Sequence, residues 1–492
     1  MEFSFYGGVD EIGGNRIEVS SGDERIFLDF GTRFNVEGLY FEEFLRPRSF
    51  SSLGDLIELG ALPKLRGIYR EDLLRNMGLK FEDEPCASAV LLSHAHLDHA
   101  GALHHIRRDI PFYMTWESYL ILKALEDTGT ASNDFLHYRP KFHFTRKEKL
   151  VGNTTHKRSR EKFERPVKIL KPYCTEDAGD FSVTPAPVDH SIPGSCAYLI
   201  EGDDAVIYTG DLRFRGRRDH DSRRFVKNAS RFSPNIMITE GTRIDQENST
   251  FEDDIEERAS AIASHHRGLV IVNYPIRDLD RFLTFYRAAV NSDRTLAVGL
   301  KQAYVLKLFE GLGYPSLDDL AVYIPRRGWG LISGDAFVCF DGEWIPASDL
   351  DEDYMIQDYR LWERDFLELD NTITYRDLQD EPSEYIFQCD YFEFNELIDI
   401  RPENAVYIKS KTEPFNEEME IDAERERNWL RHFGIAQYNR FHSSGHAGRS
   451  DLIEMILDIE PEAIYPVHTR SREEFEVFRD EGIDVLVPET RK

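Results

Sequence analysis

The spacing of hydrophobic and polar residues predicts short strands toward both ends of the chain. Short runs that alternate or are continuously apolar, and that end in turn residues, favour strands. Such runs occur at 25–30, 87–92, 205–208, 235–239 and 463–467. Apolar residues at intervals of three and four are typical of amphipathic helices. This spacing occurs at 103–108, 116–125 and 451–457.

The middle of the chain has a different pattern, in which predicted helices and strands alternate. Helical spacing at 251–265, 278–289 and 302–311 alternates with short apolar runs at 268–274 and 294–300. Strands that alternate with helices at this spacing favour a parallel α/β layer. The fold class expected from the whole pattern is therefore α/β.

Length and composition limit the class of protein. The chain has 492 residues, of which 41% are hydrophobic and 30% are charged, as is typical of globular domains. This length predicts two or three domains. No window is apolar enough to span a membrane, and residues 1–7 lack the pattern of a signal peptide. The five cysteines are scattered and never form a CxxC pair, which favours a reducing, cytoplasmic location.

The net charge of −30 argues against a generally basic, nucleic-acid-binding surface. The charge is nevertheless uneven. Residues 139–171 contain 12 Lys+Arg against 3 Asp+Glu, and residues 211–231 contain 8 against 3, whereas residues 341–430 contain 8 against 27. A solvated face explains the acidic stretch well. The two basic runs leave room for a local basic groove.

The segment Ser93-His94-Ala95-His96-Leu97-Asp98-His99 is the strongest chemical signal in the sequence. Imidazole and carboxylate groups are ligands for zinc and similar divalent ions. A tight turn after a strand could aim His94 and His96 at one ion, with Asp98 and His99 facing a second. The alternative is a polar loop whose histidines are hydrogen-bonded within the protein.

Three further candidate ligands lie among turn residues or directly after predicted strands, where loops present functional groups. They are His190, Asp211 and His468. An isolated histidine among the sixteen in this chain is more often structural than a ligand. The case for each residue therefore depends on the whole set.

The His-x-His-x-Asp-His motif, followed by His190 and Asp211, resembles the metallo-β-lactamase superfamily. This resemblance implies an αββα sandwich with one or two metal ions at the edge of two facing sheets. It assigns His94, His96 and His190 to a first metal and Asp98, His99 and His468 to a second, with Asp211 bridging both. Asp29 would hydrogen-bond a ligand. Zn²⁺ is the expected ion, with Mn²⁺ as an alternative.

The order of later motifs is similar to that of the β-CASP nucleases. Glu240-Gly241-Thr242 is followed by the long α/β stretch, then by Arg440–Ala447, and only then by His468. The opening residues 7–15 and the segment 442–447 look most like the ribonuclease J group. The resemblance implies a metallo-β-lactamase domain at 1–212, an inserted β-CASP domain at 213–439 and the completion of the first domain at 440–492. Gly241 and Arg243, where the group commonly has Ser and Asn, depart from its pattern.

The resemblance also implies catalytic and substrate-binding roles. Asp98, Asp211, Glu240 and His446 would be catalytic, with His446 protonating the leaving oxygen and Glu240 orienting it. The expected phosphate-binding residues are His442, Ser444, Arg213 and Arg215. The two basic runs would line an RNA groove.

The function that this resemblance implies is hydrolysis of single-stranded RNA by a water activated by two metal ions. A DNA-processing nuclease, a non-catalytic scaffold of an RNA-processing complex and a small-molecule hydrolase are alternatives. The scaffold is disfavoured because all seven ligands are present, and the small-molecule hydrolase leaves the inserted domain unexplained. No membrane partner is expected. A homodimer, the cleavage mode and the role of residues 39–78 stay open.

Overall fold

The computed structural model describes the chain except for residues 43, 49–50, 130–133, 149–153, 159–160, 248–249, 328–336, 351–355, 413–416, 439–440 and 492. Contacts divide the chain into two compact units. The first unit combines Met1–Ser249 with Gly445–Lys492, and the second is Thr250–Ser444.

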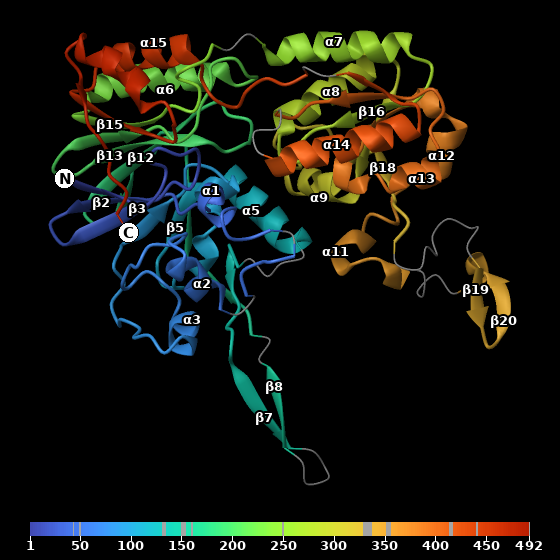
Figure 1. Cartoon of the computed structure of the whole chain (residues 1–492), viewed down its shortest axis with the longest axis horizontal. Coiled ribbons are helices and arrows are strands. Elements are labelled where there is room, and N and C mark those ends of the chain that lie inside the picture. Colours follow the sequence, from blue (N-terminus) through green and yellow to red (C-terminus); the bar gives the residue numbers. More distant parts are fainter. Residues whose placement is uncertain are drawn as a thin grey trace. The chain divides into compact units, whose positions relative to one another are not determined.

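The first unit contains two large mixed sheets (Figure 1). One sheet has the order β1 (Glu2–Phe5), β2 (Ile17–Ser21), β3 (Glu24–Leu28), β4 (Ala89–Leu91), β5 (Phe112–Thr115) and β10 (Val167–Leu170). The other has the order β11 (Glu176–Ala178), β12 (Phe181–Pro187), β13 (Cys196–Glu201), β14 (Ala205–Tyr208), β15 (Ile236–Glu240), β25 (Ala463–Val467) and β26 (Asp484–Val485). In the second sheet, β14, β15 and β25 run parallel to one another.

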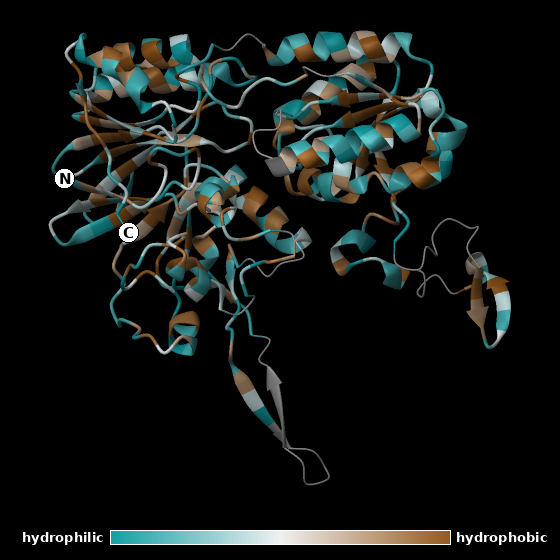
Figure 2. Cartoon of the chain, in the orientation of Figure 1, coloured by the Kyte–Doolittle hydropathy of each residue, from teal (hydrophilic) through white to brown (hydrophobic). Residues whose placement is uncertain are grey.

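The two sheets pack face to face around an apolar core. Leu28 and Leu91 from the first sheet and Tyr198, Tyr208 and Val467 from the second are buried in one cluster. The outer face of the second sheet is covered by α6 (Asp219–Phe232), α15 (Arg449–Ile459) and the 3₁₀ segment η7 (Arg472–Arg479). Hydrophobic and hydrophilic residues alternate along α6 and α15, as expected of helices with one buried face (Figure 2). Helix α5 (Trp116–Thr128) packs on β5 and β10. These layers confirm the predicted αββα sandwich.

Shorter elements complete the first unit. Its helices are α1 (Phe34–Glu37), α2 (Ser52–Glu58), α3 (Glu71–Asn76), α4 (Leu97–Ala100) and the 3₁₀ turn η1 (Leu103–His105). Two small antiparallel pairs join β6 (His137–Tyr138) to β9 (Phe163–Glu164), and β7 (Phe144–Glu148) to β8 (Thr154–Arg158).

The second unit has a seven-stranded parallel sheet. Its order is β21 (Thr372–Ile373), β18 (Ala321–Tyr323), β17 (Thr295–Gly299), β22 (Tyr385–Gln388), β16 (Val270–Asn273), β23 (Val406–Lys409) and β24 (Ala436–Tyr438). Its α-helices are α7 (Glu252–His265), α8 (Leu279–Asn291), α9 (Leu300–Leu308), α11 (Leu361–Arg364), α12 (Tyr375–Asp380), α13 (Glu396–Ile400) and α14 (Glu417–His432). A separate hairpin pairs β19 (Phe337–Phe340) with β20 (Glu343–Pro346). The parallel sheet agrees with the alternating pattern of the sequence.

The structural boundaries differ from the predicted ones at 212/213 and 439/440. The first unit continues to residue 249 because β15 is hydrogen-bonded between β14 and β25, and because α6 shares the core of that sheet. The predicted helix at 103–108 is also wrong beyond its first turn. Ile106 is extended and forms an antiparallel bridge with Tyr69, so a tertiary pairing ends the helix at His105. Within the described residues, no helix is long and apolar enough to cross a membrane.

Candidate metal centre

The predicted ligands follow strands whose ends meet at one edge of the sandwich. Strand β4 ends at Leu91, and the chain then places His94 and His96 before α4, which carries Asp98 and His99. In the second sheet, Asp211 follows β14 and His468 directly follows β25. The carboxyl ends of parallel neighbouring strands lie at the same edge, so residues far apart in sequence meet there.

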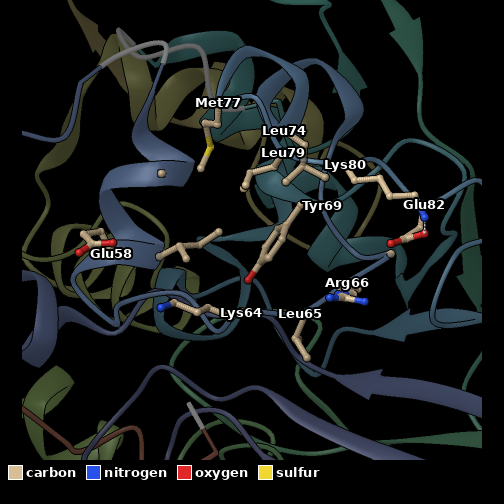
Figure 3. Close-up of a pocket in the computed structure, with 13 residues that line it drawn as sticks. Glu58, Lys64, Leu65, Arg66, Tyr69, Leu74, Met77, Leu79, Lys80 and Glu82 are labelled. Carbon is tan, nitrogen blue, oxygen red and sulfur yellow. Dashed lines mark hydrogen bonds and ion pairs between the residues drawn. The ribbon is translucent and has the colours of Figure 1, made fainter.

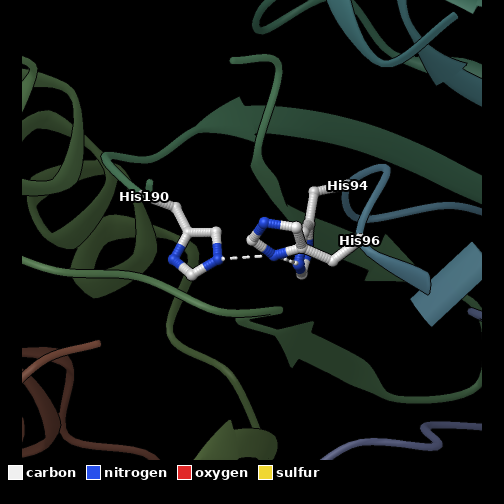
Figure 4. A group of neighbouring side chains, drawn as sticks. All are labelled: His94, His96 and His190. Atoms are coloured by element: carbon white, nitrogen blue, oxygen red, sulfur yellow. Dashed lines mark hydrogen bonds between the residues drawn. The ribbon is translucent and has the colours of Figure 1, made fainter. Parts of the chain in front are cut away.

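His94, His96 and His190 form one group of potential ligands (Figure 4). His94 Nε2 and His190 Nε2 each lie 3.1 Å from His96 Nδ1. Nitrogen ligands at about 2.0–2.1 Å from a tetrahedral zinc ion would be separated by about 3.3 Å. The spacing of the three imidazoles therefore fits a shared metal ion.

Asp98, His99, Asp211 and His468 form a second group. His99 Nε2 lies 3.1 Å from Asp211 Oδ2, and His468 Nε2 lies 3.3 Å from Asp98 Oδ2. The Asp211 carboxylate also approaches the first group, since its Oδ2 lies 3.7 Å from His94 Nε2 and 3.9 Å from His190 Nε2. Asp211 is thus within ligand spacing of both groups.

Two buried atoms of the second group lack a hydrogen-bond partner among the described residues. They are His99 Nε2 and Asp211 Oδ1. A buried polar atom without a partner is costly, and metal coordination is one way to satisfy it. Together with the nitrogen and oxygen donors, these atoms fit divalent metal ions.

The second ring nitrogen of four of the histidines is engaged by the protein. His94 Nδ1 lies 3.0 Å from Ser93 Oγ, and His468 Nδ1 lies 2.8 Å from Thr242 Oγ1. His99 Nδ1 contacts Asp29, and His190 Nδ1 contacts the Gly445 carbonyl oxygen. Such contacts fix the tautomer and the orientation of a metal-binding imidazole. They direct each Nε2 into the centre.

Asp29 is the hub of a buried network beneath the centre. Its Oδ2 lies 2.7 Å from His99 Nδ1 and accepts a hydrogen bond from the Tyr208 hydroxyl at 2.6 Å. The Ser93 backbone N–H donates to Asp29 Oδ1 at 2.7 Å. Asn15 in turn donates to the Tyr208 hydroxyl at 2.9 Å. The contact expected of Asp29 with a ligand is present. Asn15 ends the 7–15 motif and Tyr208 ends the predicted strand at 205–208, but sequence reasoning assigned neither of them a role in the centre.

Burial and neighbouring charges set the protonation of these groups. Burial, with His99 nearby, lowers the pKa of His94, and burial together with His96 lowers the pKa of His190. Burial alone would lower the pKa of His99, but Asp211 and Asp29 raise it well above its usual value. Burial raises the pKa of Asp211, and His468 and His99 lower it by more. The carboxylate of Asp211 is therefore ionised, which is the form that can bind a metal ion.

Glu240 and His446 form a pair beside the second group. His446 Nδ1 lies 2.8 Å from Glu240 Oε2, and Glu240 Oε1 accepts a hydrogen bond from the Leu212 backbone N–H at 2.8 Å. His446 Nδ1 is 3.9 Å from Asp211 Oδ2. Burial lowers the pKa of His446, whereas Glu240 and Asp211 raise it by more, to about 9. The pair has the geometry of an oriented acid.

The structure corrects the prediction that Arg213 contacts substrate. Arg213 is fully buried, and its Nε lies 3.0 Å from Asp189 Oδ1. Its backbone N–H donates to the Asp189 carbonyl at 2.8 Å. Arg213 therefore supports the segment that carries His190. Arg218, from the same basic run, donates to the His190 carbonyl at 2.9 Å.

The other predicted substrate-binding residues are placed differently. Arg215 is partly exposed, with its Nε 3.3 Å from Asp451 Oδ2. His442 and Ser444 belong to the second unit, at its C-terminal end. Their roles in phosphate binding stay predictions.

Gly31 allows the loop that carries Asp98 to pack directly against the backbone at residue 31. A Cβ on Gly31 would lie 1.6 Å from the Asp98 carbonyl oxygen, so no side chain fits there. The same carbonyl accepts hydrogen bonds from the backbone N–H groups of Gly14 and Asn15 at 2.9 and 3.1 Å. The glycine-rich N-terminal segment thus packs on the loop that presents Asp98.

A separate cavity lies between α2 and α3 (Figure 3). It has a volume of about 550 Å³, and Tyr69, Leu74 and Met77 contribute to its apolar wall. None of the predicted site residues lines it. The residues expected from the sequence to carry chemistry therefore lie outside this cavity.

Two family models match separate segments of the chain. Residues 87–306 match the metallo-beta-lactamase superfamily. The chain is similar to the metallo-β-lactamase superfamily over this segment. Residues 435–488 match the Zn-dependent metallo-hydrolase RNA specificity domain, which covers His446 and His468. The superfamily expected from the motif order is confirmed.

Similar proteins extend over nearly the whole chain. Ribonuclease J of Pyrococcus abyssi is 22% identical over 95% of this chain and 89% of its own length. Ribonuclease J of Helicobacter pylori strain 26695 is 21% identical over 94% of this chain, which spans only 55% of that protein. A crystal structure of a protein of unknown function from Enterococcus faecalis V583 has a TM-score of 0.70 and 23% identity, and covers 100% of this chain and 98% of its own. Within the superfamily, the chain is ribonuclease J-like.

Proposed function

We propose that the chain is a metal-dependent ribonuclease that hydrolyses phosphodiester bonds in single-stranded RNA. The observation that carries the proposal is the convergence of two ligand groups on Asp211, with the Glu240–His446 pair beside them. A scaffold protein would have no need to keep this arrangement intact. A small-molecule hydrolase would not explain the Glu240–His446 pair.

The ligand assignment follows the two groups. His94, His96 and His190 would hold one ion, and Asp98, His99 and His468 would hold the second, with Asp211 shared. Zn²⁺ suits this set, and Mn²⁺ is the alternative. Two such ions, when bound, would lower the pKa of a water held between them and would stabilise negative charge on a phosphate.

The residues of the chain supply proton transfer and orientation. The Nδ1–H of His446 donates to Glu240, so its Nε2 is available to protonate the leaving ribose oxygen. Glu240 holds the tautomer and, through the Leu212 backbone N–H, ties His446 to the segment that follows Asp211. Asp29 and Thr242 keep His99 and His468 oriented toward the centre.

Two comparisons support RNA as the substrate. Residues 435–488 match the RNA specificity domain of Zn-dependent metallo-hydrolases, and the relatives over nearly the whole chain are ribonucleases J. A DNA-processing nuclease with the same centre is the second candidate, because backbone charge and base stacking bind both nucleic acids. We also predict a cytoplasmic location and a homodimer. The proposal includes both exonuclease and endonuclease action.

One assay tests the proposal. The metal-loaded protein is incubated with end-labelled single-stranded RNA and with DNA of the same sequence, each carrying a 5′-hydroxyl, monophosphate or triphosphate. We expect cleavage of RNA, no cleavage by an Asp211→Asn variant, and a product ladder that distinguishes stepwise from internal cutting. Cleavage of DNA alone would favour the second candidate. Full activity of Asp211→Asn would refute the two-metal centre.

Metal analysis separates ligands from the proposed acid. We expect about two ions per wild-type chain. His94→Ala should lose metal, whereas His446→Ala should keep its metal and lose turnover. If His446→Ala lost as much metal as His94→Ala, His446 would be a ligand and its proposed role would be wrong.

A further inference from the structure

Helix α1 lies beside the loop that carries Asp98 but contributes nothing to the apolar core. Just before the helix, the Thr32 backbone N–H donates to the Leu97 carbonyl oxygen at 2.9 Å. Leu97 directly precedes Asp98 in the chain. None of the four residues of α1 is buried, and its first residue, Phe34, is 54% exposed. The helix is therefore fixed next to the metal centre with an aromatic side chain open to solvent.

Phe34 belongs to a patch of large, exposed, apolar side chains. Leu39 and Tyr40 are 74% and 48% exposed. Backbone hydrogen bonds keep the segment compact, since the Gly38 N–H donates to the Phe34 carbonyl oxygen at 2.9 Å. Single exposed apolar residues are common, whereas a cluster of them marks an interaction surface. Three such side chains within seven positions form a cluster of this kind.

Arg470 reaches α1 from the segment that carries His468. Arg470 and His468 are two positions apart, so their Cα atoms are separated by at most about 7 Å. The Arg470 side chain is exposed, and its Nη2 donates to Oδ1 of Asn35, the second residue of α1, at 3.2 Å. One guanidinium is thus held close to a proposed metal ligand and to the residue next to Phe34.

The Arg470 guanidinium differs from that of Arg472 in the same segment. Arg472 pairs with Asp10 at 3.3 Å. Within the described part of the chain, no carboxylate pairs with Arg470, whose hydrogen bond goes to the neutral amide of Asn35. Acidic residues outnumber basic ones by 90 to 60, so the lack of an acidic partner is informative. Arg470 keeps its charge and most of its N–H donors for an external anion.

A nucleotide matches the two parts of this surface. Its phosphate is an anion that a guanidinium can bind through two N–H donors, and its base is a flat π-system that stacks on an aromatic ring. Phe34 and Asn35 are consecutive, so a phosphate bound to Arg470 brings the attached base near the Phe34 ring. A second copy of the chain could also cover the apolar patch. The position beside the metal centre, where the substrate of the proposed function must pass, favours the nucleotide.

We propose that Arg470 and Phe34 form a nucleotide subsite beside the metal centre, in which Arg470 binds a phosphate of single-stranded RNA and Phe34 stacks on the neighbouring base. This inference rests on the proposed function for its choice of polymer. Asn35 acts as a positioning residue, because it holds the guanidinium next to the aromatic patch. The subsite should accept every base, since each base has a π-face, and should disfavour duplexes, whose bases are already stacked.

A pair of arginine variants tests the phosphate contact. Arg470→Gln removes the charge of the subsite, and Arg472→Gln is the matched control, because it removes an arginine that already has an acidic partner. The metal-loaded proteins bind a short fluorescent RNA with 2′-O-methyl phosphorothioate linkages, which resists hydrolysis. Loss of one phosphate contact should reduce the slope of log affinity against log salt by about 0.7 in Arg470→Gln. Between about 50 and 200 mM salt, wild type should then lose about 2.6-fold more affinity than this variant. Arg472→Gln should keep the wild-type slope.

An abasic RNA tests the stacking contact. Phe34→Ala should weaken binding of the RNA that carries bases by at least about fivefold, the lower range for loss of one base–aromatic stack. The same change should leave the affinity for the abasic RNA, which has the same backbone, at the wild-type value. The matched control is Phe340→Ala, since Phe340 is 57% exposed on a hairpin outside the large sheets. This control should alter the affinity for neither RNA.

Several outcomes would overturn the subsite. They include an unchanged salt slope in Arg470→Gln, an equal fall in Arg472→Gln, and an equal loss of affinity for the abasic RNA in Phe34→Ala. Loss of metal from Arg470→Gln would mean that the arginine supports His468 instead of binding RNA. A smaller oligomeric mass of Phe34→Ala in sedimentation would identify the patch as an interface between copies of the chain.

The binding assays separate the subsite from the proposed function, because they do not depend on cleavage. A wild-type protein that cleaves no RNA but shows the expected slopes and base dependence would refute the ribonuclease and support the subsite. A wild-type protein that binds neither RNA would overturn the subsite.

Discussion

Replacing Arg213 by methionine separates a structural role from a role in RNA binding. The Arg213 guanidinium and the Asp189 carboxylate are both fully buried, 3.0 Å apart. Removing one partner of such a pair leaves a buried charge uncompensated, which costs about 3–5 kcal/mol. A folded domain is stable by only about 5–15 kcal/mol, so this loss is large.

The expected shift in melting temperature follows from this free energy. The unfolding entropy is about 2.1 cal/mol/K per residue, so for a unit of roughly 300 residues 1 kcal/mol corresponds to about 1.6 °C, and Arg213→Met should lower the Tm by about 5–8 °C. Because Asp189 directly precedes His190, the affinity for metal should also fall, by about 10–100-fold, as for other residues that support a ligand. Calorimetry and metal titration measure the two effects.

Two variants control this experiment. Arg213→Met combined with Asp189→Asn leaves no buried charge and should recover much of the lost stability. Arg215→Met removes a partly exposed arginine from the same segment, and its pair with Asp451 should contribute less than about 1 kcal/mol. If Arg213→Met kept its Tm and its metal but flattened the salt dependence of RNA binding, the guanidinium would face RNA and our reasoning would be wrong.

Further substitutions test the surroundings of the centre. Glu240→Gln should lower kcat by about 100-fold at unchanged metal content, because His446 loses its anionic partner; an equal loss of metal would contradict this role. Thr242→Val should weaken metal binding by about tenfold, because His468 Nδ1 loses the contact that orients the ring. Calorimetric titration measures this affinity, and an unchanged affinity would show that the Thr242 contact does not support metal binding. Tyr208→Phe should cost about 1–3 kcal/mol in chemical denaturation, since it leaves Asn15 and Asp29 each short of one hydrogen bond. Gly31→Ala should abolish folding of the first unit, whereas Gly299→Ala, whose Cβ would have its nearest neighbour at 3.8 Å, should be tolerated; normal yield of Gly31→Ala would show that the Asp98 loop can move.

The sequence predicted best the helices and strands whose ends are set by residues next to them in the chain. The strands at 205–208 and 463–467 match the structure because each apolar run is bounded by turn residues. The ligands were visible because three histidines and an aspartate occupy only six positions. The layers followed from resemblance to a family, since the facing of two sheets depends on contacts between distant segments.

The sequence could not predict side-chain contacts between residues that only the tertiary structure brings together. Arg213 follows the bridging aspartate, and nothing local shows that Asp189 faces it across a buried bridge. The contact of Thr242 with His468 likewise depends on the proximity of two strand ends. The β7–β8 hairpin was not predicted, because its strands are rich in polar residues and lack an apolar alternation. Such features can be recognised only in the three-dimensional structure.

The second unit interrupts the chain between two strands that are neighbours in one sheet. Strand β15 ends at Glu240, and its partner β25 begins more than 200 residues later, at Ala463. The two ends of the second unit lie together, since the Ser443 hydroxyl donates to the Thr250 carbonyl at 3.0 Å.

This arrangement fixes the order in which the centre can assemble during synthesis. When the first 249 residues have left the ribosome, one edge of β15 is still unpaired and both His446 and His468 are missing. An unpaired strand edge invites association with other chains. The second unit must therefore fold promptly to return the chain to that edge. Slow folding there would lower the yield of metal-loaded protein, although that unit contributes none of the proposed ligands.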